Sequence, residues 1–382
     1  MSAPQVKGWC PGAFRPMMSG DGLVVRVRPP LGAISAAQAT GLADLAERHG
    51  SGVVETTARA NLQLRGVSEV AYPALMQDLR ALGLLGDADS EARRNLVLDP
   101  FRAPGTEEIA RGLLEGLSRS EFSGLPGKFG FVIDPGTPRR LAGISGDIRI
   151  EGAAGGMILR ADGSATGRRL RDSEEAVTQA LDLARWFLNS GGVGADGRGR
   201  MARHLMGGRG LLPSGLCGDV APAEPVPAPA PGPRDGGLCA AAAFGQFSAA
   251  ALRTLAEAGG PIRVTPYRML YLPDVMIQPD HPDLILDPQD PLRRVQACTG
   301  APGCPQASVT TRDLARRLAR RIPDGQIWHI SGCAKGCAFP RNADLTLVGR
   351  DGAFDLVKQG TPWDDPIRRG LSPLEIDKQI RP

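Results

Sequence analysis

Hydrophobic residues recur at helical spacing in several stretches of this chain, and these stretches predict its helices. The expected helices cover residues 37–49, 71–84, 107–119, 175–190 and 309–321. In the last of them, Leu314, Leu318 and Ile322 follow one another at four-residue intervals, so one face of that helix is expected to be buried.

Shorter runs of branched apolar residues predict strands between the helices. These strands are expected at residues 22–28, 53–58, 62–65, 129–133, 147–150, 157–161, 262–265 and 268–272. Near the C-terminal end, Leu345–Val348 and Phe354–Val357 flank the sequence Arg-Asp-Gly, which is typical of a short hairpin. The mixture of elements predicts α+β domains with antiparallel or mixed sheets.

One segment interrupts this alternation of helices and strands. Residues 221–236, with the sequence APAEPVPAPAPGPRDG, favour an extended linker without hydrogen bonds. The segment separates a longer N-terminal part from a shorter C-terminal part. A chain of 382 residues is long enough for two or three packed cores, because single cores rarely grow beyond about 250–300 residues.

The two parts repeat one pattern, a helical segment followed by glycine and then a strand. The two copies cover residues 42–66 and 252–275. Aligning their glycines places Thr56 opposite Thr265 and Arg59 opposite Arg268. We expect two such copies to pair into one composite domain about a pseudo-twofold axis.

Composition narrows the classes of partner and location. The formal net charge is +4, with basic and acidic residues interleaved, so neither nucleic acid nor a membrane surface is an expected partner. No stretch approaches about 18 consecutive apolar residues, and the first residues lack the apolar core of a signal peptide. We therefore expect a cytoplasmic protein.

Four of the seven cysteines lie within forty residues near the C-terminus, which is typical of a metal or cluster site. Cys298 and Cys304 are separated by five residues, and Cys333 and Cys337 by three. The glycines that allow close backbone approach to a cluster are Gly300, Gly303, Gly332 and Gly336. The spacing favours a [4Fe–4S] cluster over zinc, because zinc sites usually begin with a gap of two to four residues. Zinc stays open as an alternative.

The two cysteine motifs resemble those of the nitrite and sulfite reductase family, C-x5-C followed by C-x3-C. They read ACTGAPGCPQA at residues 297–307 and HISGCAKGCAFP at residues 329–340. The resemblance implies a [4Fe–4S] cluster on Cys298, Cys304, Cys333 and Cys337. In a siroheme enzyme of this family, the last cysteine would also bridge to the siroheme iron.

Further segments carry the resemblance through the N-terminal part. ETTARANLQLRG at 55–66 contains Arg59, ARRNLV at 92–97 contains Arg94, and LPGKFGF at 125–131 contains Lys128. The resemblance implies that Arg59 and Arg94 bind carboxylates of a tetrapyrrole, and an arginine fork suits that task. The expected substrate-binding residues are Arg59, Arg65, Arg94 and Lys128. Of these, Lys128 and Arg94 are also the expected catalytic residues.

One position departs from the reductase pattern. Gly130 stands where these reductases have a second lysine that handles the oxyanion substrate, which argues against oxyanion reduction. The segment KGWCPGAFRPMMSGDGLVVRVRP at 7–29 and the string SGCAKGCAFP resemble instead the precorrin-3B synthase branch of the family. That resemblance implies an oxygen-dependent monooxygenase that converts precorrin-3A to precorrin-3B, by hydroxylation with lactone formation, in aerobic cobalamin biosynthesis.

The resemblance also implies the architecture, an α+β fold with two related halves. A composite pair of ferredoxin-like half-domains is expected beside two larger α/β-layer domains. The expected parts are the first ferredoxin-like half-domain at 1–75, the tetrapyrrole-binding domain at 76–220, the linker at 221–236, the second ferredoxin-like half-domain at 237–285 and the iron–sulfur cluster domain at 286–382.

The expected reactants are precorrin-3A, dioxygen and electrons from an external reductase or ferredoxin. The branch further implies a mononuclear non-haem iron, but no two-histidine, one-carboxylate pattern is visible. His329, four residues before Cys333, stands in an apolar strand, where a histidine is more often structural. Two alternatives stay open: a siroheme-dependent sulfite or nitrite reductase, and a zinc-binding module without enzymatic activity.

Overall fold

Polar capping residues fix where the main helices begin. In the computed structural model, which describes residues 11–207 and 211–379, Ser35 and Gln38 form a reciprocal capping box at the start of α1 (Ala36–His49). Ser248 caps α7 (Ala249–Glu257) and Asp172 caps α5 (Ser173–Asn189) through backbone N–H groups of the first turn. The other helices are α2 (Tyr72–Ala81), α3 (Ala88–Arg93), α4 (Thr106–Leu117), α6 (Met201–Met206), α8 (Arg312–Leu318) and α9 (Pro373–Gln379).

All five expected helices are present, and the last is shorter than expected. The segment predicted at 309–321 contains α8, followed by a 3-10 turn at Ala319–Arg321. Leu314 and Leu318 are buried beneath it, as their spacing predicts. None of the described helices is long and apolar enough to cross a bilayer.

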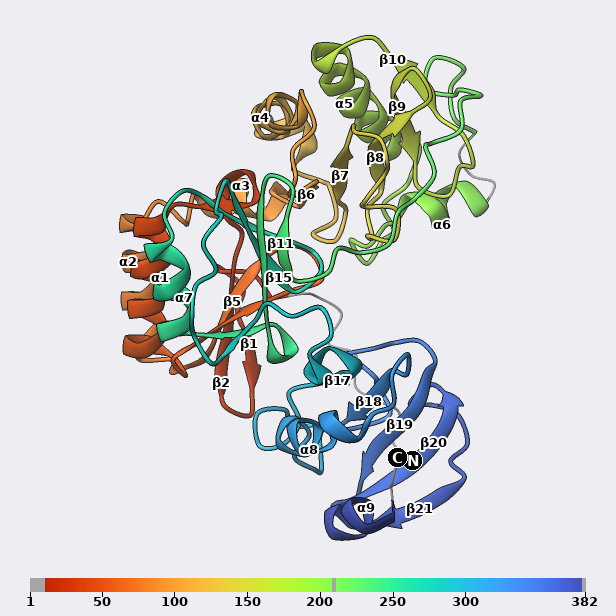
Figure 1. The fold of residues 1–382 in the computed structure, drawn as a ribbon. Helices are drawn as coiled ribbons and strands as arrows, with labels where there is room; N and C mark the ends of the chain where they lie inside the picture. The colour runs from red at the N-terminus through yellow and green to blue at the C-terminus, as the bar shows by residue number, and fades with distance from the viewer. Residues whose placement is uncertain (1–10, 208–210, 380–382) are drawn as a thin grey trace.

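A five-stranded and a six-stranded antiparallel sheet build one composite domain, which Figure 1 shows beside the helices α1, α2 and α7. The strand order of the first sheet is β1 (Met17–Ser19), β2 (Gly22–Val27), β5 (Leu62–Val67), β4 (Val53–Thr56) and β13 (Gln246–Ser248). The second runs β11 (Gly232–Arg234), β12 (Gly237–Ala242), β15 (Met269–Pro273), β14 (Ile262–Val264) and β3 (Ala33–Ile34), and β16 (Leu284–Ile285) also pairs with β12. Each sheet therefore takes one strand from the other half of the chain: β13 comes from the C-terminal half and β3 from the N-terminal half.

Two further sheets share one topology, in which the first three strands are parallel and the last two antiparallel. One runs β6 (Leu96–Leu98), β7 (Phe131–Asp134), β8 (Ile148–Ala153), β9 (Gly156–Ala161) and β10 (Arg168–Leu170). The other runs β17 (Val295–Ala297), β18 (Trp328–Ser331), β19 (Ala343–Arg350), β20 (Ala353–Gly360) and β21 (Arg368–Leu371). The expected α+β architecture with two related halves is confirmed.

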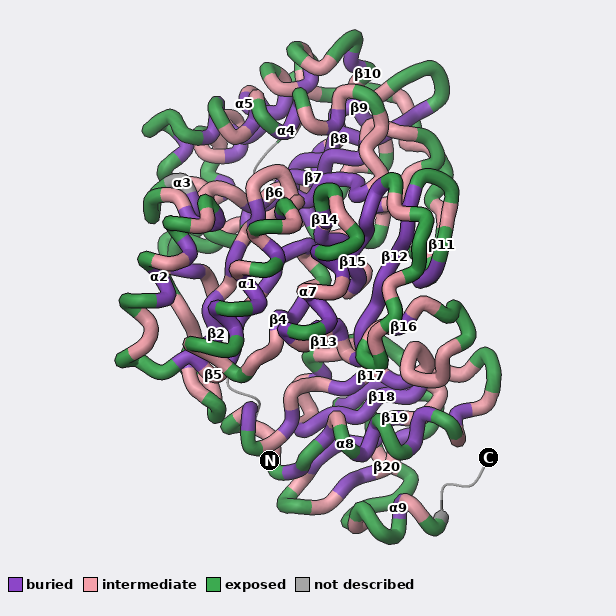
Figure 2. The backbone as a smooth tube through the Cα atoms, turned by 60° about the vertical axis from the view of Figure 1, so that its left-hand side comes forward, coloured by how far each residue is buried: buried purple, intermediate pink, exposed green. Residues whose placement is uncertain are grey.

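Each part has its own hydrophobic core. One core lies in the composite domain, a second lies between α4, α5 and the sheet that begins at β6, and a third lies beneath α8. Figure 2 shows the buried backbone running along the strands, with exposed backbone on the helices and turns around them.

The Pro/Ala-rich segment at 221–236 is extended as predicted, but it is hydrogen-bonded. Ala223 N–H donates to the Gly152 carbonyl at 2.7 Å, and Val226 N–H donates to Arg139 at 3.0 Å. The segment then ends in β11, an edge strand of the second sheet. Its prolines lie at positions other than those that donate these hydrogen bonds. An edge strand tolerates such prolines, whereas a central strand does not.

The sequence alignment of the two repeats is wrong by one residue at the hairpin turn. Thr57 N–H donates to the Asn61 carbonyl, and Thr265 N–H donates in the same way to Met269. Positive φ values fall on Ala60 and Arg268, which are therefore the matching residues. Arg59 accordingly corresponds to Tyr267, and Arg268 is not its counterpart.

Candidate functional site

The four cysteines follow two neighbouring parallel strands. Cys298 comes directly after β17, and Cys333 comes two residues after the end of β18. Because these strands run side by side in parallel, their carboxyl ends meet at one edge of the sheet, where loops can converge on a ligand. This edge brings together the two loops that the sequence analysis singled out.

The first cysteine loop, residues 298–311, closes on itself. Cys304 N–H donates to the Gly300 carbonyl at 2.7 Å, and Thr311 Oγ1 donates to the Cys298 carbonyl at 2.7 Å. Gly300 has a φ of +68°, and a Cβ on it would lie 2.5 Å from Thr311 Oγ1. Glycine is therefore required there both by the backbone conformation and by the space.

The second cysteine loop, residues 332–339, approaches the first through its backbone. Gly332 N–H donates to Cys298 Sγ at 3.1 Å. A Cβ on Gly332 would lie 2.6 Å from Ala307 Cβ and 3.4 Å from the same sulfur, so a side chain there would push the loops apart.

All four thiols come within electrostatic reach of one another. Partial burial raises the pKa of Cys333, and the nearby Cys298 and Cys304 raise it further against a hydrogen bond from the Lys335 backbone. The same two thiols also act on Cys337, the most exposed of the four. Among the described residues, no three His, Cys, Asp or Glu side chains are close enough to hold a single metal ion. These electrostatic effects place the four thiols in one region of the structure.

Arg65 fixes the first cysteine loop to the composite domain. Its Nε and Nη2 donate to Asp21 at 3.0 and 2.8 Å, and Nη2 also donates to the Gly303 carbonyl at 2.9 Å, next to Cys304. Ser19 Oγ donates to the same carbonyl. The expected carboxylate ligand is therefore already paired with a carboxylate of its own chain.

Arg59 lies at the tip of the hairpin between β4 and β5 and reaches the neighbouring domain. Thr57 Oγ1 accepts hydrogen bonds from the Arg59 and Asn61 N–H groups, which shapes the turn. The Arg59 guanidinium lies over Gly130 and close to Asn95, since a Cβ built on Gly130 would come within 2.9 Å of Arg59 Nη2. The structure thus brings three of the quoted segments to one corner.

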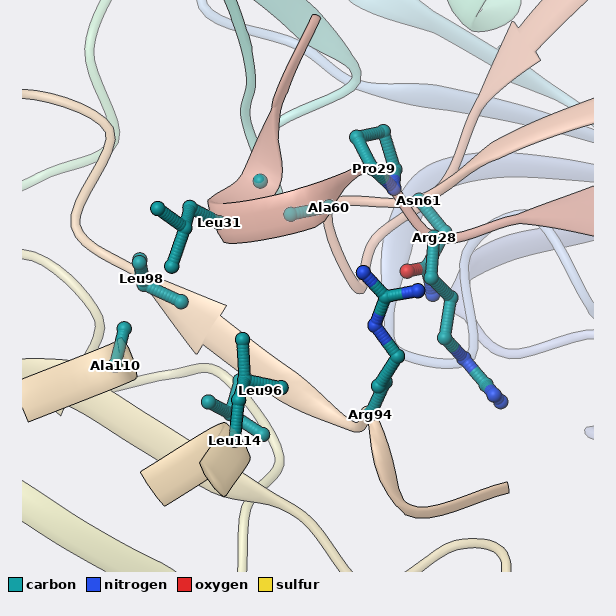
Figure 3. A pocket seen from close by; sticks show the side chains of 11 residues that line it. Arg28, Pro29, Leu31, Ala60, Asn61, Arg94, Leu96, Leu98, Ala110 and Leu114 are labelled. Carbon is teal, nitrogen blue, oxygen red and sulfur yellow. The ribbon is translucent and has the colours of Figure 1, made fainter. Parts of the chain in front are cut away.

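Arg94 lies beside a small pocket between the composite domain and the domain that contains α4. Leu31, Leu96, Leu98, Ala110 and Leu114 line its apolar side, and Arg28 and Arg94 stand at one end (Figure 3). The pocket holds about 20 Å³, room for about one water molecule.

Glu91, which the sequence analysis missed, forms an ion pair with Arg94. The Arg28 guanidinium donates to the Glu91 backbone carbonyl, so one acidic residue gathers both arginines. The i, i+3 spacing of Glu91 and Arg94 was available in the sequence. Lys128 is exposed, two residues before Gly130.

Asp147 is a second residue that sequence reasoning missed. It is fully buried, and its Oδ2 accepts the Gly130 N–H at 2.9 Å. Its Oδ1 accepts from Arg200 Nε at 2.9 Å and from the Met201 N–H at 2.8 Å. No local motif marked this aspartate, because its partners come from distant segments.

His329 is fully buried on β18, and neither ring nitrogen has a hydrogen-bond partner. Burial, with the neighbouring Arg268 guanidinium, lowers its pKa to about 4, so the imidazole is neutral at pH 7. The ring of Phe339, the last residue of the second cysteine loop, lies edge-on to the His329 ring with 6.1 Å between the ring centroids.

Comparisons with known proteins show the family and the fold. The sequence model of the nitrite/sulfite reductase ferredoxin-like half-domain matches residues 15–82. A precorrin-3B synthase from a Sinorhizobium species is 33% identical over an alignment 399 positions long, which covers 93% of this chain and 83% of that protein.

Other relatives match more locally or by fold. A ferredoxin–nitrite reductase from Synechococcus elongatus is 30% identical over 141 residues, which cover 34% of this chain and 27% of that enzyme. The structure of the Mycobacterium tuberculosis NirA protein superposes with a TM-score of 0.62 at 18% identity, covering 94% of this chain and 79% of that one. The nitrite/sulfite reductase fold is thereby confirmed.

Proposed function

Since the chain belongs to the precorrin-3B synthase family, we propose that it is the oxidoreductase that converts precorrin-3A to precorrin-3B in cobalamin biosynthesis. The observation that carries the proposal is the extent of the likeness: at 93% of the chain it reaches into every packed part of the structure. A match confined to the ferredoxin-like half-domain would support the fold alone.

The proposed reaction consumes dioxygen. One oxygen atom enters the substrate as a hydroxyl group, with formation of a lactone, and the other leaves as water. Two electrons and two protons balance the step, and we propose that an external reductase or ferredoxin supplies the electrons.

We propose that Cys298, Cys304, Cys333 and Cys337 hold a [4Fe–4S] cluster. The donor set is all sulfur, two loops present it from adjacent strand ends, and the Gly332 N–H already points at a thiol. When bound, such a cluster accepts and passes single electrons, at a potential set by N–H donors and burial.

A mononuclear iron does not fit the described residues, because they gather no set of two histidines and a carboxylate at one point. We derive no step through it.

Arg59, Arg94 and Lys128 are the proposed ligands of the substrate's carboxylates. A precorrin is an apolar macrocycle fringed by carboxylates, and the corner described above offers cations beside apolar side chains. Arg94 is held by Glu91, so a substrate carboxylate that binds it must compete with that ion pair. Lys128 is exposed and is the residue proposed to exchange a proton with the bound substrate.

The test uses anaerobically reconstituted protein with precorrin-3A and a chemical reductant, with and without oxygen. We expect precorrin-3B only when oxygen is present, and one atom of labelled dioxygen in the product. The same product without oxygen would refute the oxygenase.

Metal and spectral measurements separate the alternatives. Iron and acid-labile sulfide, without the Soret band of an iron tetrapyrrole, are expected of the proposed enzyme. A stoichiometric Soret band would support a siroheme reductase instead, and zinc without iron would exclude the cluster.

A further inference from the structure

The space in front of Gly130 is filled by side chains from two other segments. A Cβ on Gly130 would lie 2.7 Å from Asn95 Nδ2, 2.9 Å from Arg59 Nη2 and 3.2 Å from the Asn95 carbonyl oxygen. These separations are well inside the roughly 3.5–4.0 Å of an ordinary non-bonded contact. Any side chain at this position must therefore displace a neighbour.

The backbone of Gly130 cannot retreat to make room. Its N–H donates to Asp147 Oδ2, and its carbonyl accepts from the Asp147 and Ile148 N–H groups at 2.6 and 3.2 Å. Asp147 is in turn held by Arg200 and Met201. The residue is clamped to the neighbouring strand from both of its polar groups.

Asn95 is fixed as well. Only 5% of it is exposed, and its Nδ2 donates to the Phe129 carbonyl at 2.8 Å. Its backbone carbonyl accepts the Phe131 N–H at 2.9 Å. The Arg59 guanidinium, at the end of a long side chain, is therefore the neighbour that a Cβ would move.

We propose that Gly130 is a positioning residue that acts on substrate binding through Arg59. Because Gly130 has no side chain, the Arg59 guanidinium crosses from the composite domain and lies against the start of β7, where it presents its donors to a carboxylate of the tetrapyrrole. The inference rests on the proposed function, because it takes precorrin-3A as the ligand. Beyond that function, the inference is that Gly130 sets the position of the Arg59 guanidinium. A positive charge at this corner is then not sufficient for substrate binding unless it is placed correctly.

The test measures the dissociation constant of precorrin-3A by anaerobic absorbance titration of the full-length reconstituted protein. Gly130→Ala is expected to weaken binding about tenfold. Arg59→Ala is expected to weaken it by about tenfold to a hundredfold, because it removes a hydrogen bond to a charged group. Gly130→Lys adds a cation but displaces Arg59, so it is also expected to bind more weakly than wild type. Gly143→Ala is the matched control, because a Cβ there meets nothing within 4 Å.

A double variant separates positioning from general damage. If Gly130 acts through Arg59, the Arg59→Ala, Gly130→Ala variant binds no more weakly than Arg59→Ala alone. A double variant weaker by the product of the two single effects would overturn the proposal, because Gly130 would then act on its own. Binding by Gly130→Ala or Gly130→Lys equal to wild type would overturn it too. If wild type itself fails to bind precorrin-3A, it is the proposed function that fails.

Discussion

Replacing Arg65 with methionine is expected to cost about 2–4 kcal/mol of unfolding free energy and to leave precorrin-3A binding nearly unchanged. Removing one partner of a buried ion pair costs about 3–5 kcal/mol, because the other charge is left buried without compensation. The Arg65 side chain is 10% exposed and that of Asp21 is 29% exposed, so water recovers part of the loss at Asp21. The Gly303 carbonyl also loses a donor next to the first cysteine loop.

The assay is a thermal unfolding scan, paired with the anaerobic titration of precorrin-3A. A loss of about 2–4 kcal/mol corresponds to a melting temperature about 4–16 °C lower for a cooperative unit of about 150–250 residues. Arg48→Met is the matched control, since the Arg48–Asp78 pair spans 3.5 Å with the Arg48 side chain 63% exposed, and such pairs contribute about 0–1 kcal/mol.

The opposite pattern would refute the reasoning. If Arg65→Met melts like Arg48→Met but loses precorrin-3A binding tenfold or more, Arg65 binds the substrate, as expected from the sequence. The structure would then have assigned the wrong partner to this guanidinium.

Three further substitutions test other groups. Burial and the Arg268 guanidinium lower the pKa of His329 from 6.5 to about 4. Between these pH values the folded protein binds fewer protons than the unfolded chain, so its stability is lost as the pH falls. The melting temperature of His329→Leu should therefore fall less steeply than that of wild type from pH 6.5 to 4.5, and an unchanged slope would contradict this. Burial raises the pKa of Asp134 from 3.8 to about 6. The ionised carboxylate therefore destabilises the folded protein more as the pH rises through that range, by at most about 3 kcal/mol at pH 7. The melting temperature of Asp134→Asn relative to wild type should be higher at pH 7 than at pH 4, and no such difference would count against the assignment. Gly332→Ala should lower the iron bound per chain several-fold while the circular dichroism spectrum stays native, because the added Cβ would lie 2.6 Å from Ala307 Cβ in the first cysteine loop. An iron content equal to that of Gly143→Ala would argue against close approach of the two loops.

The cysteine loops show what a sequence can predict. Two short motifs, each with a fixed spacing and flanking glycines, identify four residues whose convergence depends only on two neighbouring parallel strands. The element types followed in the same way from local periodicity, because each helix or strand buries a face of its own.

Residues that act through distant partners were not predictable in this way. Arg65 is expected from the sequence to bind the substrate because an arginine fork suits a carboxylate, whereas its observed partner Asp21 lies 44 residues away. Asp147 carries no motif, and its role becomes visible only when Gly130 and Arg200 are brought to it. The repeat alignment shifted by one residue because the glycines do not reveal how many residues a turn contains.

The exchange of β3 and β13 between the two antiparallel sheets has a consequence for dissecting the protein. A gene cut at the Pro/Ala segment would give each fragment a sheet lacking its outermost strand, with an open row of unsatisfied amides and carbonyls. Such fragments should precipitate when expressed separately and recover solubility when co-expressed, because each fragment supplies the edge strand that the other lacks.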